Sequence, residues 1–256
     1  MTKWVGLALG LAAVLLPGGL AEASIVVLNR DSTALQTGNA TGGNEGPTGF
    51  TDESLLTDPT GPFSFDSDEL IESRSRGRFG IRTESRVDGN LAVNDQVVDD
   101  SPGVLMLSVS RDAAGSTLVR SGSATLTQAQ RFQVDFVVAD RPVSYTLAGL
   151  FDPNDLPGVH RVWLGLIGGP AELAYDNSAA ITFAHEGELA PITAPGEAYR
   201  FVVELDQTIG GTDNLSSTID LDLVLNIVPD PGTGLLLVCG LTLSSAGIGW
   251  RRQADI

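Results

Sequence analysis

The residues of this chain that are best suited to chemistry form two groups of oxygen ligands. Carboxylate and amide oxygens are the ligands that hard cations such as Ca²⁺ take in flexible geometry. Neither group has EF-hand spacing, and the chain has no nonapeptide Ca²⁺ repeat. We therefore expect no required cofactor, with a bound Ca²⁺ ion or solvated turns as the two alternatives. A carboxylate pair could also serve glycoside hydrolysis, which depends on its separation. The groups are Asp66, Asp68 and Glu69, and Asp152, Asn154 and Asp155.

The only basic cluster of the chain lies in one short segment. Arg74, Arg76 and Arg78 occupy alternate positions, and Arg82 and Arg86 follow them. Because alternate residues share one face of a strand, we expect the first three to form an arginine ladder. Such a ladder could bind an acidic polysaccharide. The alternative is that these arginines pair with the acidic residues around them.

The chain lacks the signatures of common catalytic sites. No Gly-x-Ser-x-Gly motif marks a nucleophile, and the two histidines, His160 and His185, are expected to be solvated at strand ends. We therefore expect a protein that is not an enzyme. Trp163 and Tyr145 could stack on sugars, but their alternation with other residues places both in the predicted core.

The composition narrows the range of partners. The formal net charge is −17 at pH 7, which repels nucleic acid and anionic lipid and favours divalent cations or neutral glycans. The single cysteine, Cys239, and the single lysine, Lys3, lie near the chain ends. The region between them therefore has no thiolate site, no cysteine-rich zinc site and no lysine nucleophile.

Alternating apolar and polar residues dominate residues 70–228 and predict strands. Short strands separated by turn residues favour an all-β fold, an antiparallel β-sandwich that is jelly-roll-like, with one wet face on each sheet. Residues 24–69 are rich in Gly, Thr, Asn, Asp and Pro, so we expect an irregular N-terminal arm there, with at most one strand packed on the core. The alternation is clearest at 104–110, 117–126, 132–138, 143–147, 160–167, 179–184, 199–206 and 219–227.

A membrane-length apolar segment lies close to the C-terminus. Residues 232–250 carry no charge and, at about 1.5 Å per helical residue, just span a hydrocarbon core of roughly 30 Å. Arg251 and Arg252 follow and would hold the tail on the cytoplasmic side. The motif Val228-Pro229-Asp230-Pro231 precedes the segment, and its prolines make it stiff and extended. We therefore expect a transmembrane helix after this motif.

The N-terminus has the pattern of an export signal. After a short basic start, Trp4–Leu16 is apolar, and Ala21 and Ala23 form an A-x-A cleavage site before Ser24. We expect signal peptidase to remove residues 1–23.

The C-terminal motif, apolar span and terminal arginines together resemble the PEP-CTERM sorting signal, which exosortases of Gram-negative bacteria process. The resemblance covers residues 229–256, and Asp230 stands where the family usually has Glu. It implies a precursor anchored in the inner membrane, processing by an exosortase, and a final place at the cell surface or outside the cell. It also implies a link to exopolysaccharide or biofilm matrix.

Three hypotheses for function follow from the signals and the predicted sandwich. The first is a structural or adhesive protein of the cell surface or extracellular matrix. The second is a Ca²⁺-dependent carbohydrate-binding module, and the third is a glycan-active hydrolase.

Overall fold

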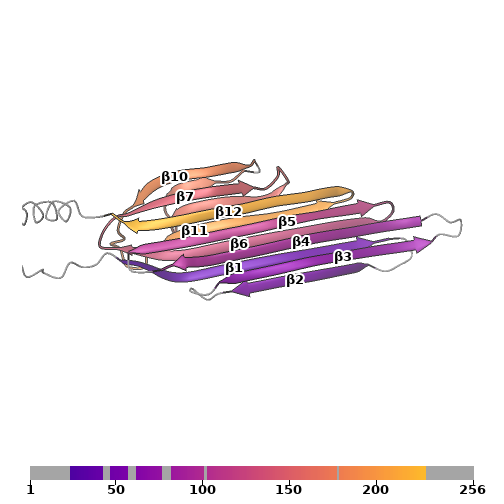
Figure 1. Ribbon diagram of the computed structural model, residues 1–256, viewed down its shortest axis with the longest axis horizontal. Coiled ribbons are helices and arrows are strands. Elements are labelled where there is room, and N and C mark those ends of the chain that lie inside the picture. The colour runs from indigo at the N-terminus through magenta and orange to yellow at the C-terminus, as the bar shows by residue number, and fades with distance from the viewer. Residues whose placement is uncertain are drawn as a thin grey trace, which may run out of the picture.

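Two β-sheets packed face to face make up the described protein (Figure 1). The computed structural model describes residues 24–42, 47–56, 62–76, 82–100, 103–177 and 179–228. All neighbouring strands pair antiparallel, so the predicted antiparallel β-sandwich is confirmed. The strands are β1 (Ser24–Thr41), β2 (Thr48–Leu56), β3 (Phe63–Arg76), β4 (Arg82–Asp99), β5 (Val104–Val119), β6 (Ser123–Ala139), β7 (Val143–Asp152), β8 (Gly158–Leu166), β9 (Ala171–Tyr175), β10 (Ile181–Leu189), β11 (Tyr199–Gly210) and β12 (Asp213–Ile227).

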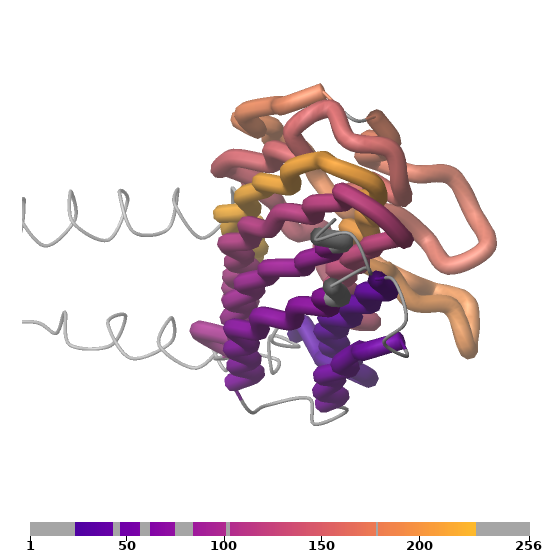
Figure 2. The backbone as a smooth tube through the Cα atoms, turned by 90° about the vertical axis from the view of Figure 1, so that its right-hand side faces the viewer, coloured from indigo at the N-terminus to yellow at the C-terminus, as the bar shows by residue number. Residues whose placement is uncertain are grey.

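Each sheet contains six strands. Sheet A has the order β2-β1-β6-β11-β8-β9, and sheet B has the order β10-β7-β12-β5-β4-β3. Figure 2, which looks along the strands, shows the two layers side by side. In β12 the side chains of Leu221, Leu223 and Leu225 are buried, whereas Asp220 and Asn226 are exposed. Alternate residues therefore face the core and the solvent, as the sequence predicts for this strand.

The segment 24–69 is not an irregular arm, so that prediction is wrong. Its described residues form β1, β2 and the first half of β3, and β1 pairs with the central strand β6 from end to end. The inward positions of β1 include Ala34, Gly38 and Ala40, and the ring of Phe50 in β2 lies over Gly38. Such small inward residues give no hydrophobic periodicity. Main-chain pairing with β6 and close packing stabilise the strand instead.

The described chain begins and ends at the same end of the sandwich. Ser24 in β1 pairs with Ala139 at the end of β6, and the main-chain N–H of Val228 donates to the carbonyl of Pro142 at 3.2 Å in the turn that follows β6. We call this the terminal end and the opposite one the distal end. No helix within the described ranges is long and apolar enough to cross a membrane, and the expected span at 232–250 lies outside them.

Two apolar clusters fill the space between the sheets. The terminal core, toward the terminal end, is built from large side chains such as Phe136, Phe201 and Leu223. The distal core is smaller and includes Ala113 and Ala124 among its buried residues. The two ends of one sandwich therefore differ in how much apolar surface they bury.

Glycines of sheet B receive a leucine of sheet A in the distal core. Gly89 in β4 and Gly115 in β5 are cross-strand partners, and Leu126 of β6 packs against both. A Cβ at Gly115 would lie 2.2 Å from Leu126 Cδ2, and one at Gly89 would lie 2.9 Å from Leu126 Cδ1. The leucine therefore fits only because these two positions carry no side chain.

Candidate functional site

The first group of predicted Ca²⁺ ligands does not converge. Asp66 and Asp68 are exposed on β3, and Glu69 is the next residue along the strand, so its side chain points to the other face. Asp66 lies in the same cross-strand row as Asp152 of β7, but four strands away. At about 4.8 Å per strand, roughly 19 Å separates the two main chains. The structure therefore does not bring the two predicted groups together.

The second group forms a tight turn after β7. Asp152 Oδ1 accepts a hydrogen bond from the main-chain N–H of Asn154 at 2.8 Å, and Asn154 and Asp155 have φ values of 56° and 54°. These values lie in the left-handed region, which Asn and Asp tolerate better than most residues. Among the described residues, no group of three or more His, Cys, Asp or Glu side chains is placed to hold a metal ion.

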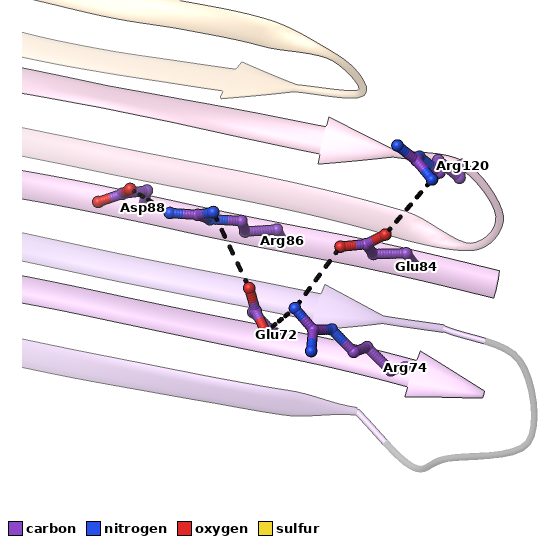
Figure 3. Close-up of polar contacts among 6 residues, drawn as sticks. All are labelled: Glu72, Arg74, Glu84, Arg86, Asp88 and Arg120. Carbon is purple, nitrogen blue, oxygen red and sulfur yellow. Dashed lines mark hydrogen bonds and ion pairs between the residues drawn. The ribbon is translucent and has the colours of Figure 1, made fainter. Parts of the chain in front are cut away.

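One arginine of the predicted ladder, Arg74, takes part in ion pairs on the outer face of sheet B (Figure 3). Arg74 Nη2 lies 2.5 Å from Glu72 Oε2 on its own strand and 3.8 Å from Glu84 Oε1 on β4. Further pairs join Arg86 to Glu72 at 3.9 Å, Arg86 to Asp88 at 2.9 Å, and Arg120 to Glu84 at 3.7 Å. We call these six residues the ion-pair network. The network agrees with the alternative interpretation of this segment, in which the arginines pair with acidic neighbours.

The remaining arginines of this segment lie around the turn between β3 and β4. Arg76 and Arg82 are cross-strand partners at the ends of these strands, whereas Arg78 lies outside the described residues.

A shallow depression on the outer face of sheet A is lined by both aromatic and charged residues. Trp163 of β8 is half-buried there, and the depression has a volume of about 290 Å³. The Cζ atom of Arg161 lies 5.9 Å from the centroid of the Trp163 ring, within cation–π range. Its lining residues are Val159, Arg161, Trp163, Ala174, Tyr175, Asp176 and Glu204. We call this the Trp163 depression.

The placement of Trp163 corrects the expectation that it lies in the core, while Tyr145 is buried as expected. His160 is only 4% exposed, so the expectation of a solvated histidine is also wrong there. Both errors have the same cause, which is that the sequence analysis did not identify the buried face of β8. His160 shares the inward face of β8 with Val162, which leaves Trp163 on the outer face. His185 is partly buried, with Nε2 3.0 Å from the Tyr145 hydroxyl oxygen.

A belt of buried polar side chains separates the terminal core from the distal core, and hydrophobic patterning does not reveal it. Arg30 of β1 donates to the carbonyl oxygen of Asp95 at 2.7 Å, and Gln130 of β6 donates to Asp95 Oδ1 at 2.8 Å. Arg111 of β5 donates to the carbonyl oxygen of Leu205 at 3.0 Å. The polar belt comprises Arg30, Ser32, Asp95, Arg111, Gln128, Gln130, His160, Gln207 and Ser217.

Burial dominates the electrostatics of the polar belt. It raises the pKa of the Asp95 carboxyl to about 8, although the nearby Arg30 and the hydrogen bond from Gln130 favour the charged form. Burial also lowers the pKa of Arg111 to about 9, against the attraction of Asp206. Asp95 Oδ2 has no hydrogen-bond partner among the described residues. The belt is therefore the part of the interior where protonation should affect stability most.

The predicted processing signals flank the sandwich. Ser24, the first residue after the expected cleavage site, begins β1, and Val228 is the last residue described. The other residues of both signals lie outside the described ranges; they are Ala21, Ala23, Pro229, Asp230, Pro231, Arg251 and Arg252.

Comparisons with known proteins identify no family for this chain. No protein-family model matches it, and neither does any curated protein. It resembles one solved structure weakly, the GH31 α-xylosidase Xac1773 of Xanthomonas citri, at 8% identity and a TM-score of 0.21. The match covers 73% of this chain and 32% of that chain, so the chain spans about a third of the xylosidase. A TM-score of 0.21 is too low to support a conclusion about fold or function.

Proposed function

We propose that this chain is an exported protein, sorted by an exosortase, with a structural or adhesive role at the cell surface or in the extracellular matrix. The observation that carries the proposal is that the described chain begins and ends at the terminal end. A C-terminal anchor after Val228 would then hold the sandwich by that end. At about 3.3 Å per residue, the 18 residues of β1 would project roughly 60 Å from it.

We also propose that the sandwich is an extended jelly roll. Strands β10-β7-β12-β5 of sheet B and β6-β11-β8-β9 of sheet A together have the strand order of two interlocked Greek keys. The other four strands widen the sheets: β1 and β2 are added beside β6, and β4 and β3 are added beside β5. This extension makes both sheets broad and supports a structural role more than an enclosed active site.

The sorting proposal is tested by removing the stiffness of the C-terminal motif. In the double variant Pro229→Ala with Pro231→Ala, the precursor should accumulate in the membrane while the sandwich stays folded, because the motif loses its extended shape. Subcellular fractionation and the size of the mature protein measure the effect. The matched control is Asp230→Glu, which keeps the charge and both prolines and should be processed normally.

The terminal arginines provide a second test of sorting. Replacing Arg251 and Arg252 by Ser removes the charges expected to retain the tail in the cytoplasm, so processing should fall here too. An unchanged mature size and location in both double variants would reject the sorting proposal.

Carbohydrate binding is the second candidate function, and the Trp163 depression is the observation that favours it. A half-buried indole beside charged side chains on an open sheet face offers an apolar surface and hydrogen-bonding groups in one place.

A further inference from the structure

We infer that the Trp163 depression is a binding site for a neutral glycan and that its contacts need no metal ion. The inference gives the carbohydrate-binding alternative a location and a ligand class, and it does not depend on how the protein is sorted. It also places binding on sheet A, away from the arginines of sheet B that the sequence indicates.

The depression has an apolar surface on which a sugar ring can lie. Trp163 is flanked across the strands by Ala174 of β9 and by Val202 of β11, and both neighbours are smaller than the indole. Val159 lines the same depression and is 45% exposed. Trp163 is only partly buried on this face, so part of the indole remains accessible from solvent. Aromatic side chains supply large, rigid contact areas of this kind.

Hydrogen-bonding groups of both kinds surround this surface. Arg161 is the direct cross-strand partner of Glu204. On the opposite edge of β8, Val162 pairs with Tyr175 of β9. In this antiparallel register Arg161 lies opposite Asp176, the residue just beyond the end of β9. The row therefore reads carboxylate, guanidinium, carboxylate across three strands. Sugar hydroxyls can donate to the carboxylates and accept from the guanidinium, whose five donors cannot be deprotonated in an exposed setting.

The cation–π contact orients the central arginine. With its Cζ atom 5.9 Å from the centroid of the Trp163 ring, the guanidinium of Arg161 is restrained on a strand rather than free on a loop. A group that is held in place before binding loses less conformational freedom when a ligand arrives. This favours recognition of a hydroxyl-rich ligand by a shallow site.

Charge selects a neutral ligand over an acidic one. Two carboxylates and one guanidinium line the depression, and the whole chain carries a formal net charge of −17. An anionic polysaccharide would be repelled by both. A bridging metal ion is not required, because Arg161 already supplies a positive charge from the strand position between those of Glu204 and Asp176.

The experiment titrates the full chain, purified in detergent, with soluble glycans while following tryptophan fluorescence. The probes are cellohexaose, maltohexaose and mannohexaose as neutral ligands, and an alginate oligomer as the acidic one. Of the three tryptophans, Trp4, Trp163 and Trp250, only Trp163 lies in the sandwich, so a saturable change in emission reports on this site. We expect at least one neutral hexamer to bind with equal affinity in Ca²⁺ and in EDTA.

Substitutions then locate the site. Trp163→Ala should weaken binding, measured by isothermal titration because the reporter is lost, about tenfold or more. Glu204→Gln should weaken it less, since an amide still offers an acceptor. The matched control, Arg74→Ala on sheet B, should leave affinity unchanged. Circular dichroism and melting curves show whether each variant is folded, and Trp163→Phe, which keeps an aromatic ring, should retain part of the affinity.

Three outcomes would overturn the proposal. One is that none of the neutral hexamers binds. A second is that binding depends on Arg74 and not on Trp163, or that alginate is preferred. The third is loss of binding in EDTA, which would mean that side chains alone do not make the contacts. None of these bears on processing of the C-terminal motif, so failure here and failure of the sorting proposal are separable.

Discussion

The terminal and distal ends of the sandwich are stabilised by different interactions. At the terminal end large rings pack between the sheets, as in the stacked pair Phe136 and Tyr199, whose centroids are 5.8 Å apart. At the distal end a glutamine crosses between the sheets. Gln36 Nε2 on sheet A donates to Ser67 Oγ at 2.8 Å and to the carbonyl oxygen of Gly89 at 3.1 Å on sheet B. One end therefore relies on apolar area and the other on directed bonds and small residues.

This difference predicts different responses to mutation. Burial of apolar area is non-directional and tolerates changes of shape, whereas a site shaped by glycines tolerates no added volume. The polar belt between the two cores adds a third behaviour, because its charged groups couple stability to pH. Variants in each region test these properties.

The largest effect should come from a charge in the terminal core. Leu223→Asp places an unpaired carboxylate where the leucine is fully buried and should cost about 4 kcal/mol or more of unfolding free energy, measured by urea denaturation. Asp222→Ser, one residue away on the outer face, should change stability by no more than about 0.5 kcal/mol. Equal losses in the two variants would contradict the separation of the faces.

The polar belt should make stability depend on pH through Asp95. The pKa of its carboxyl is about 3.8 in the unfolded chain, and burial raises it to about 8 in the folded protein. Between these values the folded state holds a proton that the unfolded state has released. The free energy of unfolding should therefore fall as pH rises through this window, on the order of a few kcal/mol in total.

Asp95→Asn removes the titration while keeping an acceptor for Gln130, so this fall should be absent or much reduced. Urea denaturation at pH 5 and pH 8 measures it for both proteins. The control is Asp112→Asn, an exposed position on β5, which should keep the pH dependence of the unmodified chain. A pH profile of Asp95→Asn that matches the unmodified protein would rule out this role for Asp95.

The distal core should be intolerant of added volume. Gly115→Ala puts a Cβ 2.2 Å from Leu126 Cδ2, and we expect a loss of about 1–3 kcal/mol in unfolding free energy from overpacking. Combining it with Leu126→Ala, which removes the clashing atoms, should cost less than the sum of the two single changes. Strict additivity would show that the glycine and the leucine do not share one packing site.

The smallest effect should come from the ion-pair network on the surface. Arg74 is about half exposed, so Arg74→Ala should cost less than about 1 kcal/mol, and the loss should shrink further in high salt. Glu84→Gln should behave similarly, and the double variant should lose less than the two single losses added. A loss above that of Gly115→Ala would mean that surface charge contributes more to the distal end than its small core does.

The strands with large inward residues could be predicted from the sequence, and those with small ones could not. In β12 the alternation of Leu221, Leu223 and Leu225 with polar residues identifies both the strand and its buried face. In β1 the inward positions include Ala34, Gln36 and Gly38, which show no apolar period. The pairing of β1 with β6 and the approach of sheet B make it a strand, and both are long-range contacts.

The candidate site shows the same limit. Alternation in β8 reveals that residues 160, 162 and 164 share one face and that Arg161 and Trp163 share the other. A period of two leaves open which face is buried, and a single-residue shift exchanges them. The apolar pair Val162 and Leu164 was the available signal for the inward face. Asp176 and Glu204 join the site only because β9 and β11 flank β8.

The all-β class and the faces of the most apolar strands follow from the sequence alone, and the sequence also predicts linear signals at the two chain ends, because each of these depends on neighbours along the chain. Tertiary contacts alone bury Arg30 together with Asp95, place glycines of sheet B against Leu126, and leave Trp163 on the solvent face beside Arg161. Those features depend on which strands lie beside and opposite one another, and strands distant in the sequence are brought together only when the sheets form.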